Sequence, residues 1–361
     1  MSRPEPSPAR PDERGAAGSL AGRDPRVPAQ QLVAELVPPP RFAGVRFSSY
    51  VPAPDQPTQA EAVAAMSAFG ESVLAGERGR GGGLAGLFKR RSAPQGPPGV
   101  YLDGGFGVGK THLLSSLYHQ VVTEGGRTAA YGTFVEYTNL VGALGFRQAV
   151  EALSPHDLVC IDEFELDDPG DTVLMSRLMR ELVDAGARLA ATSNTLPGAL
   201  GEGRFAAQDF QREIQALAGQ FAVQRVDGED YRHRGLPAAP APVDDAAVER
   251  AAARPGATLD DFADVLAHLA RVHPSRYGAM VRDTAAVCLR GVSTVGDQMV
   301  GLRLVVLADR LYDRDVPVVA SGVPFDEVFT EELLQGGYRK KYLRAVSRLS
   351  ALARDGAALV G

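Results

Sequence analysis

GVYLDGGFGVGKTHLL, residues 99–114, holds the strongest structural signal in this chain. A short apolar strand is predicted at Val100–Asp103, and a helix is predicted from Lys110 to Val122. Between them, residues 104–111 fit the pattern G-x-x-x-x-G-K-[ST], whose glycines let backbone N–H groups converge on a phosphate where side chains would collide. The N-terminus of the helix adds a partial positive charge. The sequence therefore predicts a phosphate-binding loop between a strand and a helix.

The side chains of this loop have separate predicted tasks. Lys110 should reach the β- and γ-phosphates of ATP, and the Thr111 hydroxyl should be a ligand of Mg²⁺. Arginine replaces lysine almost everywhere else, since only four of the 38 basic residues are lysines, so we infer that a chemical demand retains Lys110. The predicted nucleotide contacts are Gly104, Gly105, Phe106, Gly107, Val108, Gly109, Lys110, Thr111 and His112.

Two further polar pairs follow predicted strands, at the sheet edge where ligands bind in parallel α/β folds. The unbroken apolar run Leu158–Ile161 leads into Asp162 and Glu163. Asp162 should hold Mg²⁺ through water, and Glu163 should orient and polarise the attacking water. Ser193-Asn194 ends another predicted strand, where these residues are either part of the site or a helix cap.

Composition divides the chain into one large core and a second segment. Residues 1–30 are rich in Pro, Ala, Gly and Arg and are predicted to form a disordered tail. The predicted ATPase core spans 31–236 and contains a Gly/Pro-rich basic insertion at 76–98, either a solvated loop or a partner-binding loop. An Ala/Pro-rich linker at 237–247 precedes an α/β segment at 248–361, which we expect to complete the ATPase module.

Strands and helices alternate along the core. Strands are predicted at 128–131, 158–162 and 188–192, with a helix at 171–185 before the last of them. This alternation is typical of a parallel sheet. We therefore expect an α/β fold of the P-loop NTPase class, with helices on both faces of the sheet.

The second segment repeats part of the core at low fidelity. LVCIDEF around Cys160 and AVCLRGV around Cys288 lie 128 residues apart, and so do Ser193 in LAATSN and Ser321 in VVASGV. The later copy has Arg, Gly and Gly at the positions of the predicted catalytic Asp, Glu and Asn. It is either a degenerate duplication or an unrelated unit of similar length. Both interpretations exclude a second ATP site there.

Bulk properties restrict the environment and partners. A formal net charge of -6 gives no global attraction to nucleic acid or to an anionic membrane. Cys160 and Cys288 lie inside apolar runs, which indicates reduced thiols without a disulfide framework. No apolar stretch approaches the roughly 18 residues that a membrane span needs. We expect a cytoplasmic protein without stable membrane insertion.

The chain resembles the ZapE/AFG-like ATPase family. GVYLDGGFGVGKTHLL, CIDEF and LAATSNTLP carry this resemblance, and so do VDGEDYRHR at 226–234, VVLADRLYDRDVPVVAS at 305–321 and RAVSRL at 344–349. It extends from about residue 45 to the C-terminus. The resemblance implies an AAA+-like core, ATP with Mg²⁺, and a cytoplasmic bacterial protein linked to cell division through FtsZ.

Three stretches qualify the resemblance. The His/Phe/Arg-rich run that follows the second strand in the family is here YGTFVEYTNL, so partner contacts carried there are in doubt. The insertion at 76–98 also departs from the family. FSSY at 47–50 resembles the adenine-side segment of DnaA- and DnaC-like proteins, and the alternative is a pair of ordinary core aromatics.

The resemblance also implies further site residues. In AAA+ proteins a polar residue at the position of Asn194 touches the γ-phosphate and the attacking water. An arginine from a neighbouring subunit completes the site, which implies a homo-oligomer in the ATP state, and Arg204 and Arg212 compete for that role. Arg344 or Arg348 would instead contact nucleotide from the same chain.

Three classes of function remain open at this point. We favour a mechanochemical ATPase that remodels a protein client. The alternative is a DnaC-like loader associated with nucleic acid, for which Arg90, Arg91, Lys340 and Lys341 would form a basic path. A kinase is the third class, but an acid poised for water at Glu163 favours hydrolysis over transfer.

Overall fold

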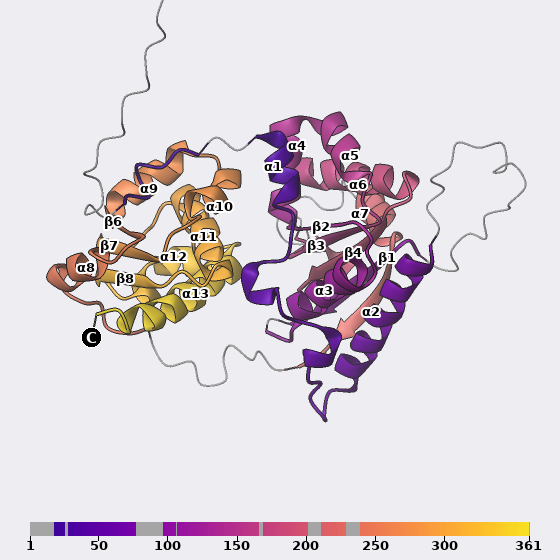
Figure 1. The fold of residues 1–361 in the computed structure, drawn as a ribbon, viewed down its shortest axis with the longest axis horizontal. Helices are drawn as coiled ribbons and strands as arrows, with labels where there is room; N and C mark the ends of the chain where they lie inside the picture. The colour runs from indigo at the N-terminus through magenta and orange to yellow at the C-terminus, as the bar shows by residue number, and fades with distance from the viewer. Residues whose placement is uncertain are drawn as a thin grey trace, which may run out of the picture. The chain divides into compact units, whose positions relative to one another are not determined.

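The computed structural model describes residues 18–25, 28–76, 97–105, 107–165, 169–200, 211–228 and 239–360. The chain divides into two compact units, and each is described separately (Figure 1). Residues 27–236 form the P-loop unit. Residues 1–26 and 237–361 form the second unit. Most of the predicted insertion at 76–98 lies outside the described residues.

A five-stranded sheet forms the centre of the P-loop unit. Its strands are β1 (Gly99–Gly104), β2 (Ala129–Thr133), β3 (Leu158–Asp162), β4 (Arg188–Ser193) and β5 (Phe221–Val226). The order is β2-β3-β4-β1-β5, and all neighbouring pairs are parallel. Because β1 lies between β4 and β5, the loop that follows β1 starts beside the carboxyl ends of both. The predicted parallel α/β fold is confirmed.

Alternating side chains along these strands build a core on each face of the sheet. Tyr101, Val159 and Ile161 pack against α4 to α7, whereas Leu102 and Cys160 pack against α2 and α3. These helices, together with the short N-terminal α1, are α1 (Ala29–Ala34), α2 (Pro57–Ala75), α3 (Lys110–His119), α4 (Phe134–Leu144), α5 (Phe146–Leu153), α6 (Pro169–Asp184) and α7 (Gln211–Ala218). Helices on both faces agree with the prediction (Figure 1).

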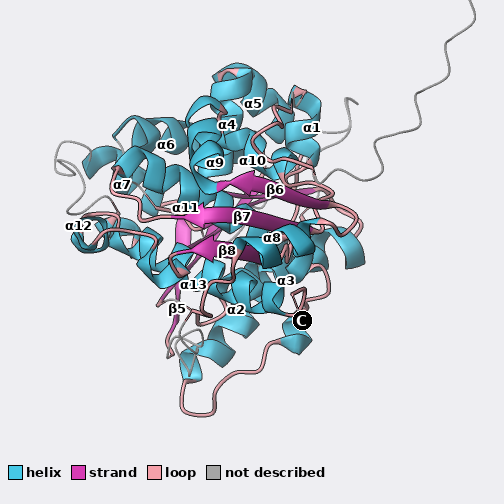
Figure 2. Ribbon diagram, turned by 90° about the vertical axis from the view of Figure 1, so that its left-hand side faces the viewer, coloured by secondary structure: helices cyan, strands magenta, loops and turns pink. Residues whose placement is uncertain are grey.

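The second unit has a parallel sheet of its own, with strand order β6-β7-β8 (Figure 2). Its elements are α8 (Asp245–Ala252), β6 (Ala257–Asp261), α9 (Phe262–Arg271), α10 (Tyr277–Met280), β7 (Ala286–Val292), α11 (Gln298–Asp313), β8 (Val318–Gly322), α12 (Glu331–Gln335) and α13 (Arg339–Ala357). Small side chains of α8 cover one face, and α9, α11 and α13 cover the other. In the described parts of both units, no helix has the length and apolarity needed to cross a bilayer.

Two strands were not predicted from the sequence. β5 is an edge strand whose residues Val223 and Arg225 are exposed, so its apolar signal is weak. β6, with the sequence ATLDD, ends in two acids and lacks a continuous apolar run. Both strands are recognisable only once their neighbours in the sheet are known.

Part of the N-terminal tail is ordered, which corrects the prediction of disorder for residues 18–25. Gly18 forms a parallel bridge with Thr258 of β6, and the side chain of Leu20 is fully buried in the core of the second unit. The Asp260 carboxylate accepts a hydrogen bond from the backbone N–H of Leu20 at 2.8 Å. The sequence could not reveal this order. Leu20 is one buried apolar residue in a Gly/Ala/Arg-rich segment, and hydrogen bonds to a distant strand produce no periodic pattern in the sequence.

The strands of the second unit repeat the register of the P-loop unit. Ala129 pairs with Leu158 between β2 and β3, and Ala257 pairs with Ala286 between β6 and β7, each 128 residues later. After the next helix, the register differs by one residue. The first paired residues of β3 and β4 are 30 positions apart in the sequence, and those of β7 and β8 are 31 positions apart. The similarity therefore includes three strands, more than the two strands that the sequence indicated.

The segment before α8 extends this correspondence. The backbone N–H of Val243 donates to the carbonyl oxygen of Ala320 at 3.0 Å, so the chain passes beside β8 immediately before α8 begins. In the P-loop unit β1 runs beside β4 before α3 begins. The second unit thus has the same order of elements. Its connection before the helix is much shorter, because only Asp244 separates residue 243 from the start of α8.

Candidate nucleotide-binding site

Glycines shape the loop between β1 and α3. Gly107 and Gly109 have φ values of 71° and 90°, in the left-handed region that favours glycine. A Cβ on Gly109 would lie 2.5 Å from the ring of Tyr50, and a Cβ on Gly104 would lie 2.2 Å from the carbonyl oxygen of Val226. Backbone conformation and lack of space both explain why the loop carries glycine here.

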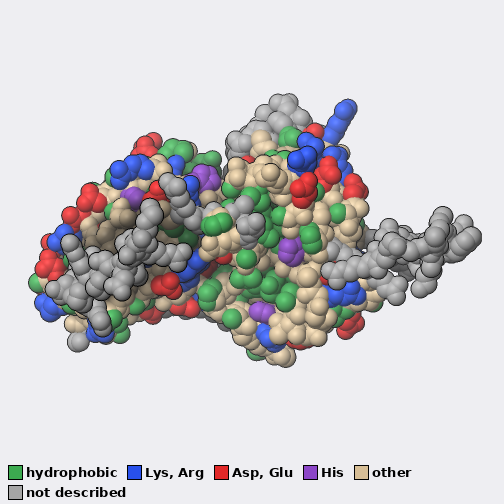
Figure 3. Space-filling view, turned by 45° about the horizontal axis from the view of Figure 1, so that its top comes forward, with side chains coloured by type: hydrophobic (Ala, Val, Ile, Leu, Met, Phe, Trp, Pro, Cys, Tyr) green, Lys and Arg blue, Asp and Glu red, His purple; other side chains and the backbone are tan. Residues whose placement is uncertain are grey.

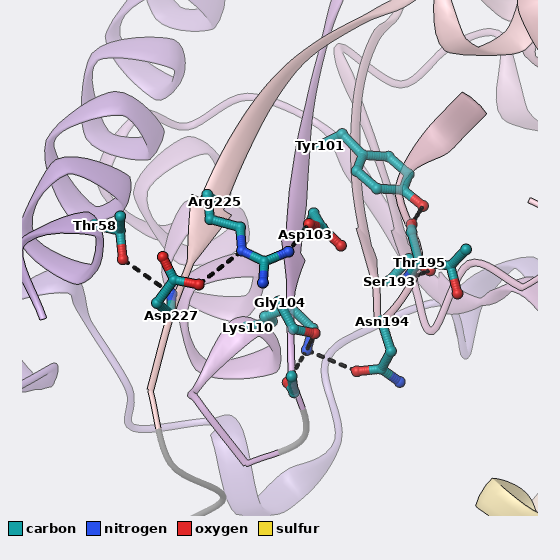
Figure 4. Close-up of polar contacts among 11 residues, drawn as sticks. Thr58, Tyr101, Asp103, Gly104, Lys110, Ser193, Asn194, Thr195, Arg225 and Asp227 are labelled. Atoms are coloured by element: carbon teal, nitrogen blue, oxygen red, sulfur yellow. Dashed lines mark hydrogen bonds and ion pairs between the residues drawn. The ribbon is translucent and has the colours of Figure 1, made fainter. Parts of the chain in front are cut away.

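Lys110 and Asn194 meet at the mouth of this loop (Figure 4). The Lys110 Nζ donates to Asn194 Oδ1 at 2.8 Å and to the carbonyl oxygen of Gly104 at 2.7 Å, and it also contacts the carbonyl of Gly105. The two side chains are 84 residues apart in sequence, and they meet because β1 and β4 are neighbours. An ammonium group beside convergent backbone N–H groups suits the negative charge of phosphates.

Asp162 is a buried carboxylate with hydrogen-bond donors on both oxygens. Its Oδ1 accepts from the Thr111 hydroxyl at 3.3 Å, from the Glu163 N–H at 3.1 Å and from the Thr192 hydroxyl. Its Oδ2 accepts from the Tyr131 hydroxyl at 2.9 Å. Thr111 and Asp162 thus place two hard oxygen donors side by side, which fits a magnesium ion whose other ligands are phosphates and water.

The structure describes no other group suited to a metal. Among the described residues there is no cluster of three or more His, Cys, Asp or Glu side chains that could hold an ion. The predicted contribution of the protein is the Thr111 hydroxyl and, through water, the Asp162 carboxylate, which lie side by side. That is the usual arrangement for magnesium, which keeps several waters and binds through substrate phosphates.

Glu163 adopts an uncommon backbone conformation. Its φ is 53°, which costs a residue other than glycine on the order of 1–3 kcal/mol. The backbone N–H of Glu163 offsets this cost because it donates to Asp162 Oδ1 and to Thr192 Oγ1, each at 3.1 Å. The sharp turn places Glu163 at the sheet edge immediately after Asp162, the predicted magnesium residue.

The segment FSSY lies against the loop. The Tyr50 hydroxyl donates to the carbonyl oxygen of Val108 at 2.7 Å, and the Tyr50 ring meets the His112 ring edge-on at 5.5 Å. The His112 Nε2 lies 3.0 Å from Ser49 Oγ. Phe47 and Tyr50 also pack against the core shared with α2 and α3. The segment therefore contacts the loop and is also part of the core, and its adenine-side role stays a prediction.

Sequence reasoning missed an ion-pair chain at the base of the loop (Figure 4). Asp103 is only 2% exposed and pairs with the guanidinium of Arg225, which is its neighbour in register on β5. The Arg225 Nε also donates to Asp227 at 2.7 Å, and the backbone N–H of Asp227 donates to Thr58 of α2 at 2.9 Å. These bonds join the strand that carries the loop to β5 and α2.

Of the four predicted arginines, three lie among the described residues. Arg212 is exposed on α7, and Arg204 and Phe106 lie outside the described residues. Arg344 and Arg348 lie on α13 of the second unit, where both pair with Asp309 of α11. Burial raises the pKa of the Asp309 carboxyl, but the two guanidinium charges outweigh burial and hold that pKa below its ordinary value. The nucleotide roles of these arginines stay predictions.

Comparison with protein families gives one match, which covers nearly the whole chain. The sequence model of the AFG1-like ATPases matches residues 26–255 and 243–357. Cell division protein ZapE of Escherichia coli (strain K12) is 32% identical over 146 residues, which are 38% of this chain and 39% of that protein. Lactation elevated protein 1 homolog B of Danio rerio is 26% identical over 164 residues, 40% of this chain and 33% of that protein. The matches thus span well under half of these relatives.

Solved structures with similar folds include proteins of DNA replication. Domain III of the replication initiation protein DnaA from Thermotoga maritima gives a TM-score of 0.39 at 21% identity, over 54% of this chain and 70% of that one. The DnaC helicase loader gives a TM-score of 0.35 at 13% identity, over 52% of this chain and 99% of that one.

Proposed function

The chain belongs to the AFG1-like ATPase family, and we propose that it binds ATP with Mg²⁺ at the P-loop unit and hydrolyses it to ADP and phosphate. One observation supports this most directly. Lys110 and Thr111, Asp162, and Asn194 come from three separate places in the sequence and converge at one edge of the sheet. Each has the chemical group that phosphoryl transfer to water requires at that place.

The chain's own residues divide the work of hydrolysis. Lys110 exchanges the loop carbonyls for oxygens of the β- and γ-phosphates, and the Asn194 amide it releases is free to contact the γ-phosphate and the water. Glu163 orients the attacking water and polarises it for attack on phosphorus. Magnesium, when bound, offsets charge on the phosphate oxygens. Thr111 and Asp162 hold that ion in place.

Phosphate release and nucleotide binding test this proposal on the full chain. ATP should bind in a magnesium-dependent manner, and phosphate should appear at a rate that falls when EDTA is added. A chain that binds neither ATP nor ADP would overturn the assignment. Binding without turnover, under every magnesium concentration, would restrict the protein to a nucleotide-dependent switch.

The hydrolysis serves to remodel a protein client in the cytoplasm, in cell division. The support is the name of the relative from Escherichia coli and the resemblance to its family, which brings in FtsZ as the candidate client. The test is co-sedimentation with FtsZ filaments, which should require ATP. Absence of the protein from the FtsZ pellet under all nucleotide conditions would remove FtsZ, while the ATPase assignment would stand.

Loading onto nucleic acid is the competing function, and charge disfavours it. The formal net charge is -6, and basic and acidic side chains are interspersed on the face shown in Figure 3. Protein–DNA contact relies on clustered Lys and Arg side chains. Stimulation of ATP turnover by single-stranded DNA, and not by FtsZ, would reverse the preference.

The ATP-bound form is a homo-oligomer in which an arginine of one subunit completes the site of the next. Arg204 and Arg212 are the two candidates. Mixing an Arg212→Ala or Arg204→Ala protein with a Lys110→Ala protein should restore part of the turnover, because a mixed interface pairs an intact loop with an intact arginine. If no mixture regains activity and turnover per chain does not rise with concentration, a self-contained monomer is preferred.

A further inference from the structure

Tyr131 lies beneath the proposed magnesium site and takes no part in the roles assigned so far. It is on β2, is 2% exposed, and packs edge-on against Tyr118 of α3 with ring centroids 6.2 Å apart. Its hydroxyl donates to Asp162 Oδ2 at 2.9 Å. A core position in a strand needs only an apolar ring, so the hydroxyl calls for a separate explanation.

The two oxygens of Asp162 have different surroundings. Oδ1 faces Thr111, Glu163 N–H and Thr192, on the side where the metal would lie. For Oδ2, the Tyr131 hydroxyl is the donor that the described residues supply. The terminal torsion of an aspartate is broad and roughly two-fold, so the carboxylate has no strong orientation of its own. A donor on each side is needed to hold its plane.

We propose that Tyr131 is a positioning residue for hydrolysis, which holds the Asp162 carboxylate so that Oδ1 stays turned toward Thr111 and the metal. The Thr111 hydroxyl donates a hydrogen bond to Oδ1, which would leave its oxygen lone pairs available to a bound magnesium ion. If the carboxylate turned, Thr111 would lose its acceptor. Partners behind the ligands of a metal site usually change metal affinity by about 10- to 100-fold when they are removed.

This inference rests on the proposed function, and Tyr131→Phe tests it with the loss of one oxygen atom. The probe is a fluorescent ATP analogue, whose affinity for the full chain is measured with Mg²⁺ and again with EDTA. In EDTA the variant should bind as the wild type does, within about twofold. The increase in affinity for the ATP analogue on adding Mg²⁺ should be about tenfold smaller in the variant than in the wild type. Half-maximal turnover of the variant should require about tenfold more Mg²⁺.

Tyr137→Phe is the matched control. Its hydroxyl is also buried and donates to β3, at the carbonyl oxygen of Cys160 at 3.1 Å, but it does not touch the carboxylate. This variant should keep the magnesium dependence of the wild type. An equal loss in both variants would show that a weakened β3 is the cause, and would overturn the proposal.

A double-mutant cycle with Asp162→Asn shows whether Tyr131 acts through the carboxylate. In the Asp162→Asn background, Tyr131→Phe should cause no further loss of magnesium dependence. Additive losses would overturn the proposal. So would a Tyr131→Phe protein that binds Mg²⁺ and nucleotide like the wild type. A wild type that binds nucleotide without hydrolysing it contradicts only the ATPase assignment, because the binding assay still reports the role of Tyr131.

Discussion

β3 and β7 are corresponding strands of two sheets with similar register, yet the residues at their carboxyl ends differ completely. β3 ends in Asp162 and is followed by Glu163, which form the proposed catalytic edge. The equivalent residue of β7 is Arg290, whose guanidinium pairs with Asp261 at 2.9 Å and with Glu249 at 3.2 Å. Acids of its own unit thus neutralise the charge of Arg290, whereas Asp162 and Glu163 lie at the proposed nucleotide site.

The helices α3 and α8, which occupy corresponding places in the two units, show the same contrast. α3 begins with Lys110 after a loop of glycines, but α8 begins with Asp245 after the N-cap Asp244. The Ser321 hydroxyl donates to the Asp245 carboxylate and accepts from the backbone N–H of Gly291. An acid at a helix N-terminus satisfies the helix dipole internally and repels phosphate. Strand register thus provides the scaffold, while a few residues at its edge determine whether it binds a nucleotide.

The largest difference between the units should appear on removing their basic residues. Lys110→Ala should weaken ATP binding about 100-fold or more and abolish turnover, because it removes the charge that faces the phosphates. Arg290→Ala should leave ATP affinity unchanged and have only a modest effect on stability, since its ion pairs are at the surface and screened by solvent. Isothermal titration calorimetry measures the ATP affinity and the number of bound nucleotides for both variants. Two nucleotides bound per chain would contradict the contrast.

A smaller effect on binding, but a large one on rate, should follow Glu163→Gln. The amide keeps the shape of the side chain but cannot polarise water, so turnover should fall about 10²- to 10⁴-fold. ATP affinity should stay within a few-fold. Single-turnover measurements of ATP cleavage separate chemistry from product release. Turnover near the wild-type rate would show that another group activates the water.

Ser321→Ala should affect stability alone. The hydroxyl links Asp245 of α8 to Gly291 of β7, and both partners are exposed to water, so its loss should cost only about 0.5–1.5 kcal/mol. Urea unfolding followed by circular dichroism should show the change, with ATP turnover of the folded protein unaltered. A loss of turnover without a loss of stability would mean that the second unit takes part in catalysis.

The cysteines should reveal no difference between the units. Cys160 and Cys288 are both fully buried. Burial raises the pKa of the Cys160 thiol well above its ordinary value and that of Cys288 to about 11. At pH 8 both remain in the unreactive thiol form, so labelling of the native protein by a thiol reagent should be far slower than labelling in urea. Rapid labelling of one cysteine would show that its unit opens.

Local sequence patterns predicted the parts of this protein whose structure and chemistry depend on consecutive residues. The glycines and Lys110 of the phosphate loop, the buried strand before Asp162, and the helix that starts at Lys110 are all recognisable without a partner, because neighbours in the chain create them. Parallel pairing of the strands followed from their alternation with helices. The degenerate nature of the second unit was also visible, in Arg290 at the position of Asp162.

Contacts between distant residues were decided only by the tertiary structure. Tyr131 reaches Asp162, and Arg225 reaches Asp103, because β2 lies beside β3 and β5 lies beside β1. Leu20 is buried because a strand edge some 240 residues later receives it. Such pairs leave no periodic signal, since strand order and register depend on how whole layers pack. The sequence therefore specified the ligand-binding loop and the acids, and packing specified the residues that hold them in position.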